Sequence, residues 1–242
     1  MKLQNCDLNF LEEFKEVEID NKITPLICAA SLGRLECTKL LLDNKTIDVN
    51  MPSDEYQCTP LGVACAAGNL EIVRLLLERN ADVNKRANFE QLPLTLCFTR
   101  FHEEVNAYEN QLICMKMAEM LLQRGADIDV VVDEDKGHTL LMQYCATKIQ
   151  LSETQRRANK KLVQFFLVHG ANPERKSKKG KTAFELAEKH CNKTEIQELL
   201  RTEKQSYFYE SRYFQPSLPF TDEKSSEPSL WNFFCGKFRW CS

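Results

Sequence analysis

The sequence predicts an all-α solenoid of stacked helix-turn-helix units, and three observations indicate this fold. The heptapeptide Thr-Pro-Leu-Ile-Cys-Ala-Ala at residues 24–30 recurs as Thr-Pro-Leu-Gly-Val-Ala-Cys at residues 59–65, which lies 35 residues later. In both copies a glycine, Gly33 or Gly68, follows nine residues after the threonine, and an apolar segment follows the glycine. Self-similarity with a period of about 20 to 50 residues is typical of repeat architectures.

The residue types explain how each unit folds. Threonine is a good N-cap, and proline suits the first helical position because its missing N–H needs no partner there. Small alanine and cysteine side chains let two helices approach closely, and glycine accepts the positive φ of the turn between them. Turn-forming sequences at 80–84, 125–129 and 170–173 then close one unit and open the next.

These motifs resemble the ankyrin-repeat family, whose pattern is T-P-L-H-x-A-A-x-x-G followed by L-L-x-x-G-A-D-V-N. The resemblance covers residues 19–201 and implies five repeats, 19–50, 51–84, 85–129, 130–173 and 174–201, the last of which is a C-terminal cap. Residues 1–18 are an N-terminal lead-in or cap, and residues 202–242 are an aromatic-rich tail. The family's histidine after T-P-L is replaced in every repeat, by Ile27, Gly62, Thr95, Met142 and Glu185.

Repeats three and four are longer than the others between their two helices. In repeats one, two and five, 17 residues separate the capping threonine from the apolar pair of the second helix, against 29 and 27 in repeats three and four. This difference predicts inter-helix insertions of 12 and 10 residues, at about 99–109 and 148–158. The capping-box pattern at 152–155 indicates that the second helix of repeat four starts early and is long.

Neighbouring repeats stack in register, so we expect the two insertions to lie together, away from the turns between repeats. We name this surface the insertion platform, and its residues are Phe101, His102, Tyr108, Gln150, Arg156 and Arg157. The alternative is two surface loops without a role, because loop insertions cost little closure entropy.

The turns between repeats, here called fingers, hold a second set of candidate residues. Ankyrin domains generally bind proteins through these fingers and through the concave face of their first helices, and the resemblance implies the same here. The candidates are Glu55, Tyr56, Asn88, Phe89, Asp133, Asp135, Arg175, Lys176, Lys178 and Lys179. The acidic finger before repeat four and the basic finger before repeat five predict an electrostatic docking edge. Solvated turns, and nuclear targeting by the basic cluster, remain alternatives.

Two asparagines, Asn50 and Asn84, each end a D-V-N turn. They resemble the asparagines that are hydroxylated in many ankyrin domains. Capping of the turn explains both residues equally well.

Aromatic residues gather near the C-terminus, at Trp231, Phe233, Phe234, Phe238 and Trp240. Linkers are poor in aromatic residues, so we expect these rings to be buried against something. They fold back on the repeats, form a short recognition motif for another protein, or contact a membrane interface, and all three interpretations stay open. The acidic, serine-containing stretch 221–227 also resembles the C-terminal translocation signals of bacterial type IV effectors.

Composition argues against several classes of protein. The 242 residues hold 32 Lys and Arg against 35 Asp and Glu, so we expect no nucleic acid as the main ligand. An acidic N-terminal segment and the lack of any apolar run of about 18 residues predict a cytoplasmic protein. None of the eleven cysteines lies in a C-x-x-C motif, and we interpret most of them as small, reduced core residues.

Catalytic motifs are also absent from the sequence. It contains no phosphate-binding glycine loop, no G-x-S-x-G and no H-E-x-x-H, so we expect no catalytic residue, cofactor or metal. Three of the four histidines, His138, His169 and His190, have structural explanations. His169, for example, is expected in the last turn of a helix, where a positive charge would interact favourably with the helix dipole.

The sequence therefore predicts a monomeric, non-catalytic protein-interaction module that acts as an adaptor or scaffold. One alternative is a structural subunit of a larger assembly, anchored by the insertions and the tail. Another is a secreted bacterial effector that binds host proteins after translocation into a host cell.

Overall fold

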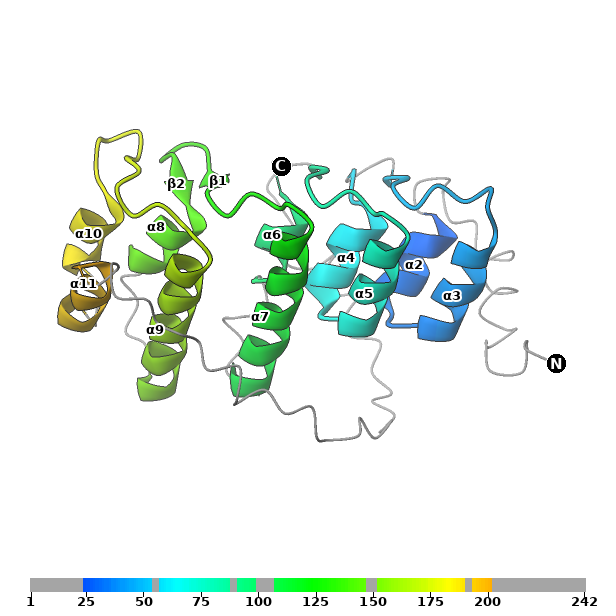
Figure 1. The fold of residues 1–242 in the computed structure, drawn as a ribbon, viewed down its shortest axis with the longest axis horizontal. Helices are drawn as coiled ribbons and strands as arrows, with labels where there is room; N and C mark the ends of the chain where they lie inside the picture. Colours follow the sequence, from blue (N-terminus) through cyan, green and yellow to red (C-terminus); the bar gives the residue numbers. More distant parts are fainter. Residues whose placement is uncertain are drawn as a thin grey trace, which may run out of the picture. The chain divides into compact units, whose positions relative to one another are not determined.

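The computed structural model describes residues 24–53, 57–87, 91–98, 107–146, 152–189 and 193–201, without the side chains of 107–110, 189 and 193. These residues form an all-α repeat fold of five helix pairs, which stand side by side in one row (Figure 1). The loops that join one pair to the next all lie along the same edge of the row. This edge carries the fingers.

The row has two layers of helices. The first helices are α2 (Pro25–Ser31), α4 (Pro60–Ala67), α6 (Pro93–Leu96), α8 (Leu140–Cys145) and α10 (Ala183–Leu186), which the 3-10 turn η3 (Ala187–Lys189) extends. The second helices are α3 (Leu35–Asp43), α5 (Leu70–Glu78), α7 (Ala107–Gln123), α9 (Glu153–Val168) and α11 (Lys193–Arg201). Second helices contact one another in order from α3 to α11, and among the first helices α2 packs on α4, α4 on α6 and α8 on α10.

Threonine starts four of the first helices, as the sequence predicts. The hydroxyl oxygens of Thr24, Thr59, Thr139 and Thr182 accept hydrogen bonds from the backbone N–H three residues later, over 3.1 to 3.4 Å. In the third pair the N-cap is Leu92, whose side chain accepts no hydrogen bond. Thr95 compensates, because its hydroxyl accepts from the Leu92 N–H at 3.0 Å and donates to the Leu92 carbonyl at 2.8 Å.

Close packing of α4 on α6 explains one departure from the family pattern. Gly62 stands where the family has histidine, and a Cβ built on it would lie 3.2 Å from Cδ1 of Leu96 on α6. The same Cβ would lie 3.3 Å from the hydroxyl of Thr59. A Cβ here would require Leu96 or Thr59 to shift by a few tenths of an ångström, so glycine permits the close contact between α4 and α6.

Aromatic rings join the third pair to the fourth. The ring of Phe98 lies 6.2 Å from that of Tyr144 and 5.2 Å from that of Phe166, in edge-to-face contacts. All three side chains are buried. Large rings therefore fill the space between the two longest repeats, whereas alanine and cysteine do this in the first two.

The second helices of the third and fourth pairs are the longest described. α7 has 17 residues and α9 has 16, against nine in each of α3, α5 and α11. The capping box predicted for α9 is present, since the hydroxyl of Ser152 accepts from the Gln155 N–H and the Gln155 side chain accepts from the Ser152 N–H. The loops that precede these two helices, 99–106 and 147–151, lie outside the described residues.

One short hairpin departs from a purely helical fold. β1 (Val131–Asp133) pairs antiparallel with β2 (His138–Thr139) in the finger that opens repeat four. These strands were not predicted from the sequence. Three consecutive valines, residues 130–132, favour extended backbone, and Gly137 accepts a φ of 66° at the turn.

Most of the described cysteines are reduced, as predicted. Cys65, Cys97, Cys114 and Cys145 are buried thiols outside any disulfide, and Cys28 and Cys58 are partly buried and likewise not disulfide-bonded. Burial raises the pKa of Cys28 and Cys58 to about 11, which keeps these thiols protonated at neutral pH. Cys37, however, is disulfide-bonded. The apolar spacing of α3 indicates that Cys37 is buried, but it carries no information on which second cysteine approaches it.

His169 also differs from expectation. It caps the C-terminus of α9, and its ring contacts that of Phe165 in a tilted arrangement, with the ring centroids 4.3 Å apart. Burial lowers the pKa of His169, while the charge of Glu119 opposes this shift. The dipole interaction expected for a positive histidine is therefore outweighed by loss of water.

We predict that Thr59→Ala lowers the free energy of unfolding by about 1 kcal/mol, because the Gly62 N–H at the start of α4 loses its acceptor. Urea unfolding followed by circular dichroism measures this change. Thr59→Ser keeps the hydroxyl and should retain most of the stability. Equal losses in both variants would show that the methyl group, and not the cap, matters.

We predict that His169→Gln makes stability less sensitive to acid. With the folded pKa below 6.5, the unfolded chain binds the proton first, so the native protein loses stability as the pH falls through 6.5 toward the folded value. Replacement by glutamine removes this loss. The measurement compares urea unfolding at about pH 7.5 and about pH 5.5 for both proteins. The same pH dependence in the variant would contradict the assignment.

Candidate functional site

Hydrogen bonds between successive turns hold the finger edge of the row together. The side-chain oxygen of Asn50 accepts from the backbone N–H of Asp82 at 2.8 Å. The amide of Asn84 donates to the carbonyl of Gly125 at 3.1 Å. These contacts give both asparagines a structural role, because each links its own turn to the next.

The same linkage continues toward the C-terminal end. The carboxylate of Asp129 accepts from the backbone N–H of Asn172 at 3.0 Å, and its carbonyl accepts from the Arg175 guanidinium at 2.6 Å. A charged group therefore bridges the turns of repeats four and five. The turns at the base of the fingers are therefore held in fixed positions relative to one another.

Two further arginines reach back to the preceding helix. The guanidinium of Arg79 donates to the carbonyl of Leu42 and lies 3.1 Å from the carboxylate of Asp43. Arg124 donates to the carbonyl of Leu77 at 2.6 Å. Both arginines satisfy carbonyls at the end of a neighbouring second helix. The sequence analysis missed this role, although an arginine follows the Leu-Leu pair at the same distance in repeats two and three.

We number each finger by the repeat that it opens. Finger 2 (51–58) and finger 5 (174–181) close in the same way, on a buried serine. In finger 2, the Ser53 hydroxyl accepts from the Cys58 N–H at 3.1 Å. In finger 5, the Ser177 hydroxyl accepts from the Lys181 N–H at 3.2 Å, and the Ser177 N–H donates to the Lys181 carbonyl at 2.9 Å. In each finger the serine thus joins the first part of the loop to its last residue.

Finger 4 (130–138) is the β1–β2 hairpin. Its Asp133 carboxylate lies 2.5 Å from Nζ of Lys136 and accepts the Lys136 backbone N–H at 3.0 Å. These hydrogen bonds lower the pKa of Asp133. Asp133 is thus half-buried and satisfied within its own finger, whereas Glu134 and Asp135 are exposed at the tip.

Fingers 4 and 5 are fastened to each other. The backbone N–H of Lys178 donates to the carbonyl of Lys136 at 2.9 Å. A Cβ built on Gly137 would lie only 3.0 Å from that same Lys178 nitrogen, so any other residue at 137 would separate the two backbones. The hairpin and the next loop are seen side by side in Figure 1. The acidic and basic clusters therefore lie next to each other.

The basic cluster is fully accessible. Arg175, Lys176, Lys178 and Lys179 are all exposed on finger 5. Within the described part of the chain, no ion pair joins them to an acidic side chain. Of the other candidate finger residues, Glu55, Tyr56, Asn88 and Phe89 lie outside the described residues.

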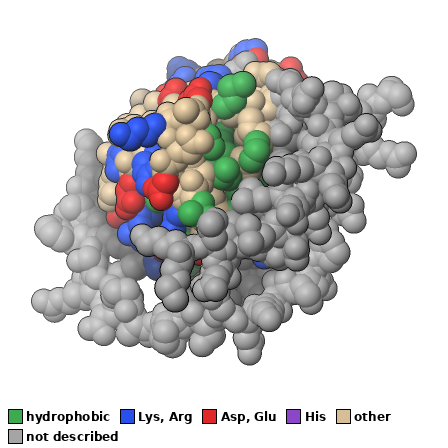
Figure 2. Space-filling model, turned by 90° about the vertical axis from the view of Figure 1, so that its right-hand side faces the viewer, with side chains coloured by type: hydrophobic (Ala, Val, Ile, Leu, Met, Phe, Trp, Pro, Cys, Tyr) green, Lys and Arg blue, Asp and Glu red, His purple; other side chains and the backbone are tan. Residues whose placement is uncertain are grey.

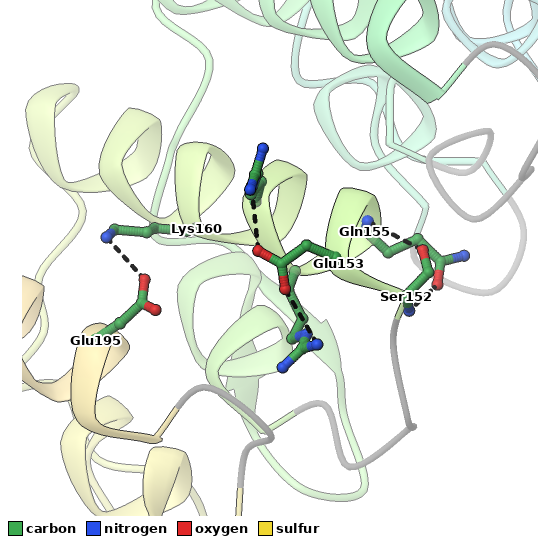
Figure 3. Close-up of polar contacts among 7 residues, drawn as sticks. Ser152, Glu153, Gln155, Lys160 and Glu195 are labelled. Atoms are coloured by element: carbon green, nitrogen blue, oxygen red, sulfur yellow. Dashed lines mark hydrogen bonds and ion pairs between the residues drawn. The ribbon is translucent and has the colours of Figure 1, made fainter.

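The candidate platform residues are only partly described. Phe101, His102 and Gln150 lie outside the described residues, as does the side chain of Tyr108. Arg156 and Arg157 on α9 both pair with the carboxylate of Glu153, at 3.0 and 3.1 Å (Figure 3). One carboxylate therefore partly offsets two guanidinium charges.

The N-terminal turns of α7 and α9 are joined by a hydrogen bond. The buried Gln111 side chain on α7 donates to the carbonyl of Ala158 on α9 at 2.8 Å. Further along α9, Nζ of Lys160 lies 2.8 Å from the carboxylate of Glu195 on α11 (Figure 3). The second helices of repeats three to five are thus linked by specific polar contacts as well as by packing.

The first helices offer less accessible surface than the fingers. Every residue of α4 is buried. The concave surface predicted from the resemblance therefore has no exposed side chain at repeat two. Among the other first helices, α10 carries the exposed Glu185, whereas finger 5 carries several exposed cations.

The end of the row at α2 and α3 is partly apolar. Hydrophobic side chains gather on this end face (Figure 2). Leu32 after α2 is 44% exposed, Met51 is 49% exposed, and Leu40 and Leu41 are partly buried.

The described residues form neither a membrane span nor a metal site. No helix in the described ranges is long and apolar enough to cross a membrane. No group of three or more His, Cys, Asp or Glu side chains in these ranges could hold a metal ion. The tail residues Trp231, Phe233, Phe234, Phe238 and Trp240 lie outside the described residues.

Comparison with known proteins identifies the first part of the row. Residues 2–87 match the family model described as ankyrin repeats in three copies. The match begins well before α2 and ends just before the third helix pair. No curated protein matches the chain.

We predict that Gln111→Met lowers the free energy of unfolding by about 1 to 2 kcal/mol, because the link to the Ala158 carbonyl is lost while the side-chain volume is kept. Gln123→Met is the matched control, since it makes the same change at an exposed position of the same helix. Its effect should stay within about 0.5 kcal/mol. Equal effects in urea unfolding would mean that the Gln111 bond does not join the two repeats.

Proposed function

Because the chain carries ankyrin repeats, we propose that it is a non-catalytic adaptor that holds another protein on its fingers. The observation that carries this proposal is that hydrogen bonds hold the fingers in fixed positions relative to one another. Turns with fixed positions present their side chains to a partner with little loss of conformational entropy on binding. A row of turns fixed by hydrogen bonds therefore suits recognition.

The exposed side chains favour the fingers over the first-helix face. The tips of fingers 4 and 5 carry exposed acidic and basic residues, whereas α4 has no exposed residue. Exposed charges at an interface raise the rate of association and select the partner. We therefore assign the main contact to the finger edge, with Asp135, Lys176, Lys178 and Lys179 as its central residues.

The insertion platform is a second contact in this proposal. The Gln111–Ala158 bond brings the starts of α7 and α9 together, which supports a shared surface at that side of the row. Arg156 and Arg157 lie on this surface, and each forms an ion pair with the carboxylate of Glu153. The platform would widen the recognition surface beyond the fingers.

Site-specific cross-linking tests the proposal. A photoreactive benzoylphenylalanine replaces Lys176 on finger 5 in the full-length chain, and a second variant carries it at Arg74, an exposed position on α5. We expect a discrete cross-linked protein from the Lys176 variant in cells and none from the Arg74 variant. A third position, Arg157, reports on the platform. Adducts at Arg74 alone would overturn the assignment to the fingers.

A further inference from the structure

We propose that fingers 4 and 5 together bind a segment of the partner in which a short acidic block lies next to a short basic block. This inference rests on the proposed function and names the chemistry of the partner. The acidic block contacts the cations of finger 5, and the basic block contacts the carboxylates of finger 4.

The two tips carry opposite charges that do not neutralise each other. Five cations of finger 5 are exposed, Arg175, Lys176, Lys178, Lys179 and Lys181. The tip of finger 4 exposes Glu134 and Asp135, together with Lys136, which pairs with Asp133. Among the described residues, no ion pair connects the cations of finger 5 to Glu134 or Asp135. Apart from Arg175, whose guanidinium donates to the Asp129 carbonyl, the cations of finger 5 are therefore available to a ligand.

The backbone fixes the distance between the two sets. The Lys178 N–H to Lys136 carbonyl bond joins the fingers at 2.9 Å, next to the close approach at Gly137. Finger 5 is also closed on Ser177, and Arg175 is held by the carbonyl of Asp129. The backbones that carry the opposite charges thus occupy neighbouring, preorganised positions, so a ligand has to order the side chains but not the loops.

A charge on finger 5 also acts on a titratable side chain of finger 4. The pKa of His138 on β2 is lowered mainly by burial; the charge of Asp133 opposes this shift, and the charges of Lys136 and, more weakly, Lys179 add to it. A cation of finger 5 therefore lies close enough to act on a residue of finger 4. The two fingers form one electrostatic surface instead of two separate ones.

This arrangement discriminates between ligands by the order of their charges. A long polyanion such as a nucleic acid would extend from finger 5 over Glu134 and Asp135 and be repelled there. A long polycation would meet the lysines. Only a segment with two short blocks of opposite sign matches both tips.

The experiment uses the full-length chain and three fluorescein-labelled peptides with the same composition. Two of them carry charge blocks, EEEEGGKKKK and KKKKGGEEEE, and the third, EKEKGGEKEK, alternates the same charges around the same pair of glycines. In fluorescence anisotropy at low salt, we expect at least one block peptide to bind about tenfold more tightly than the alternating peptide, because several exposed charge pairs form at once. Moderate salt should remove this difference.

Two triple variants with the same change in net charge provide the control. K176E/K178E/K179E reverses finger 5 and should abolish the preference for the block peptide. R34E/K45E/R74E reverses three exposed cations on the first two repeats and should leave the preference intact. Circular dichroism confirms that both variants fold.

Several outcomes would overturn the inference. Equal binding of block and alternating peptides, or an equal loss of the preference in both triple variants, would show that fingers 4 and 5 do not discriminate between ligands by the order of their charges. Tighter binding of octaglutamate, duplex DNA or phosphatidylserine vesicles than of the block peptides would show a general anion site. In all these cases a finger-dependent cross-link at Lys176 would still support the proposed function, so the two failures are distinguishable.

Discussion

The structure depends on the burial of each helix pair against the next one. A single pair of short helices cannot bury its apolar face alone, so stability comes from contacts between neighbours. Ala29, Ala30, Ala64 and Cys65 are completely buried where the first two repeats meet. Small side chains at this junction keep the helices close, and this closeness in turn brings the turns within hydrogen-bonding distance. The finger edge is therefore a consequence of the packing.

Repeats three and four bury their apolar faces against each other with larger side chains and longer second helices. Phe98, Tyr144 and Phe166 fill the space between them, and Gln111 joins their long second helices. Rings of this size bury more surface per residue than alanine does. Irregular repeats are thereby accommodated without interrupting the row of second helices, which contact one another in order from α3 to α11.

The finger edge combines rigidity with exposed charge, two properties that usually oppose each other. Charged side chains favour water, and long lysines lose entropy when they are ordered. Here the Ser177 turn and the Lys178–Lys136 hydrogen bond fix the backbone of finger 5, while the lysine side chains stay exposed. Recognition of a protein through this edge would use the backbone for position and the side chains for selectivity.

The sequence by itself determined the helix ends, the repeat length and the capping residues, because Thr59, Gly68 and Ser152 act on backbone groups within a few residues. Only the tertiary structure decided which fingers touch, which rings fill the third junction, that Cys37 is disulfide-bonded and that finger 4 is a hairpin. It also reversed the expectation for His169, because burial depends on packing. The contacts at Asn50, Gln111 and Lys178 join residues 32 to 47 positions apart, and no local pattern encodes such distances.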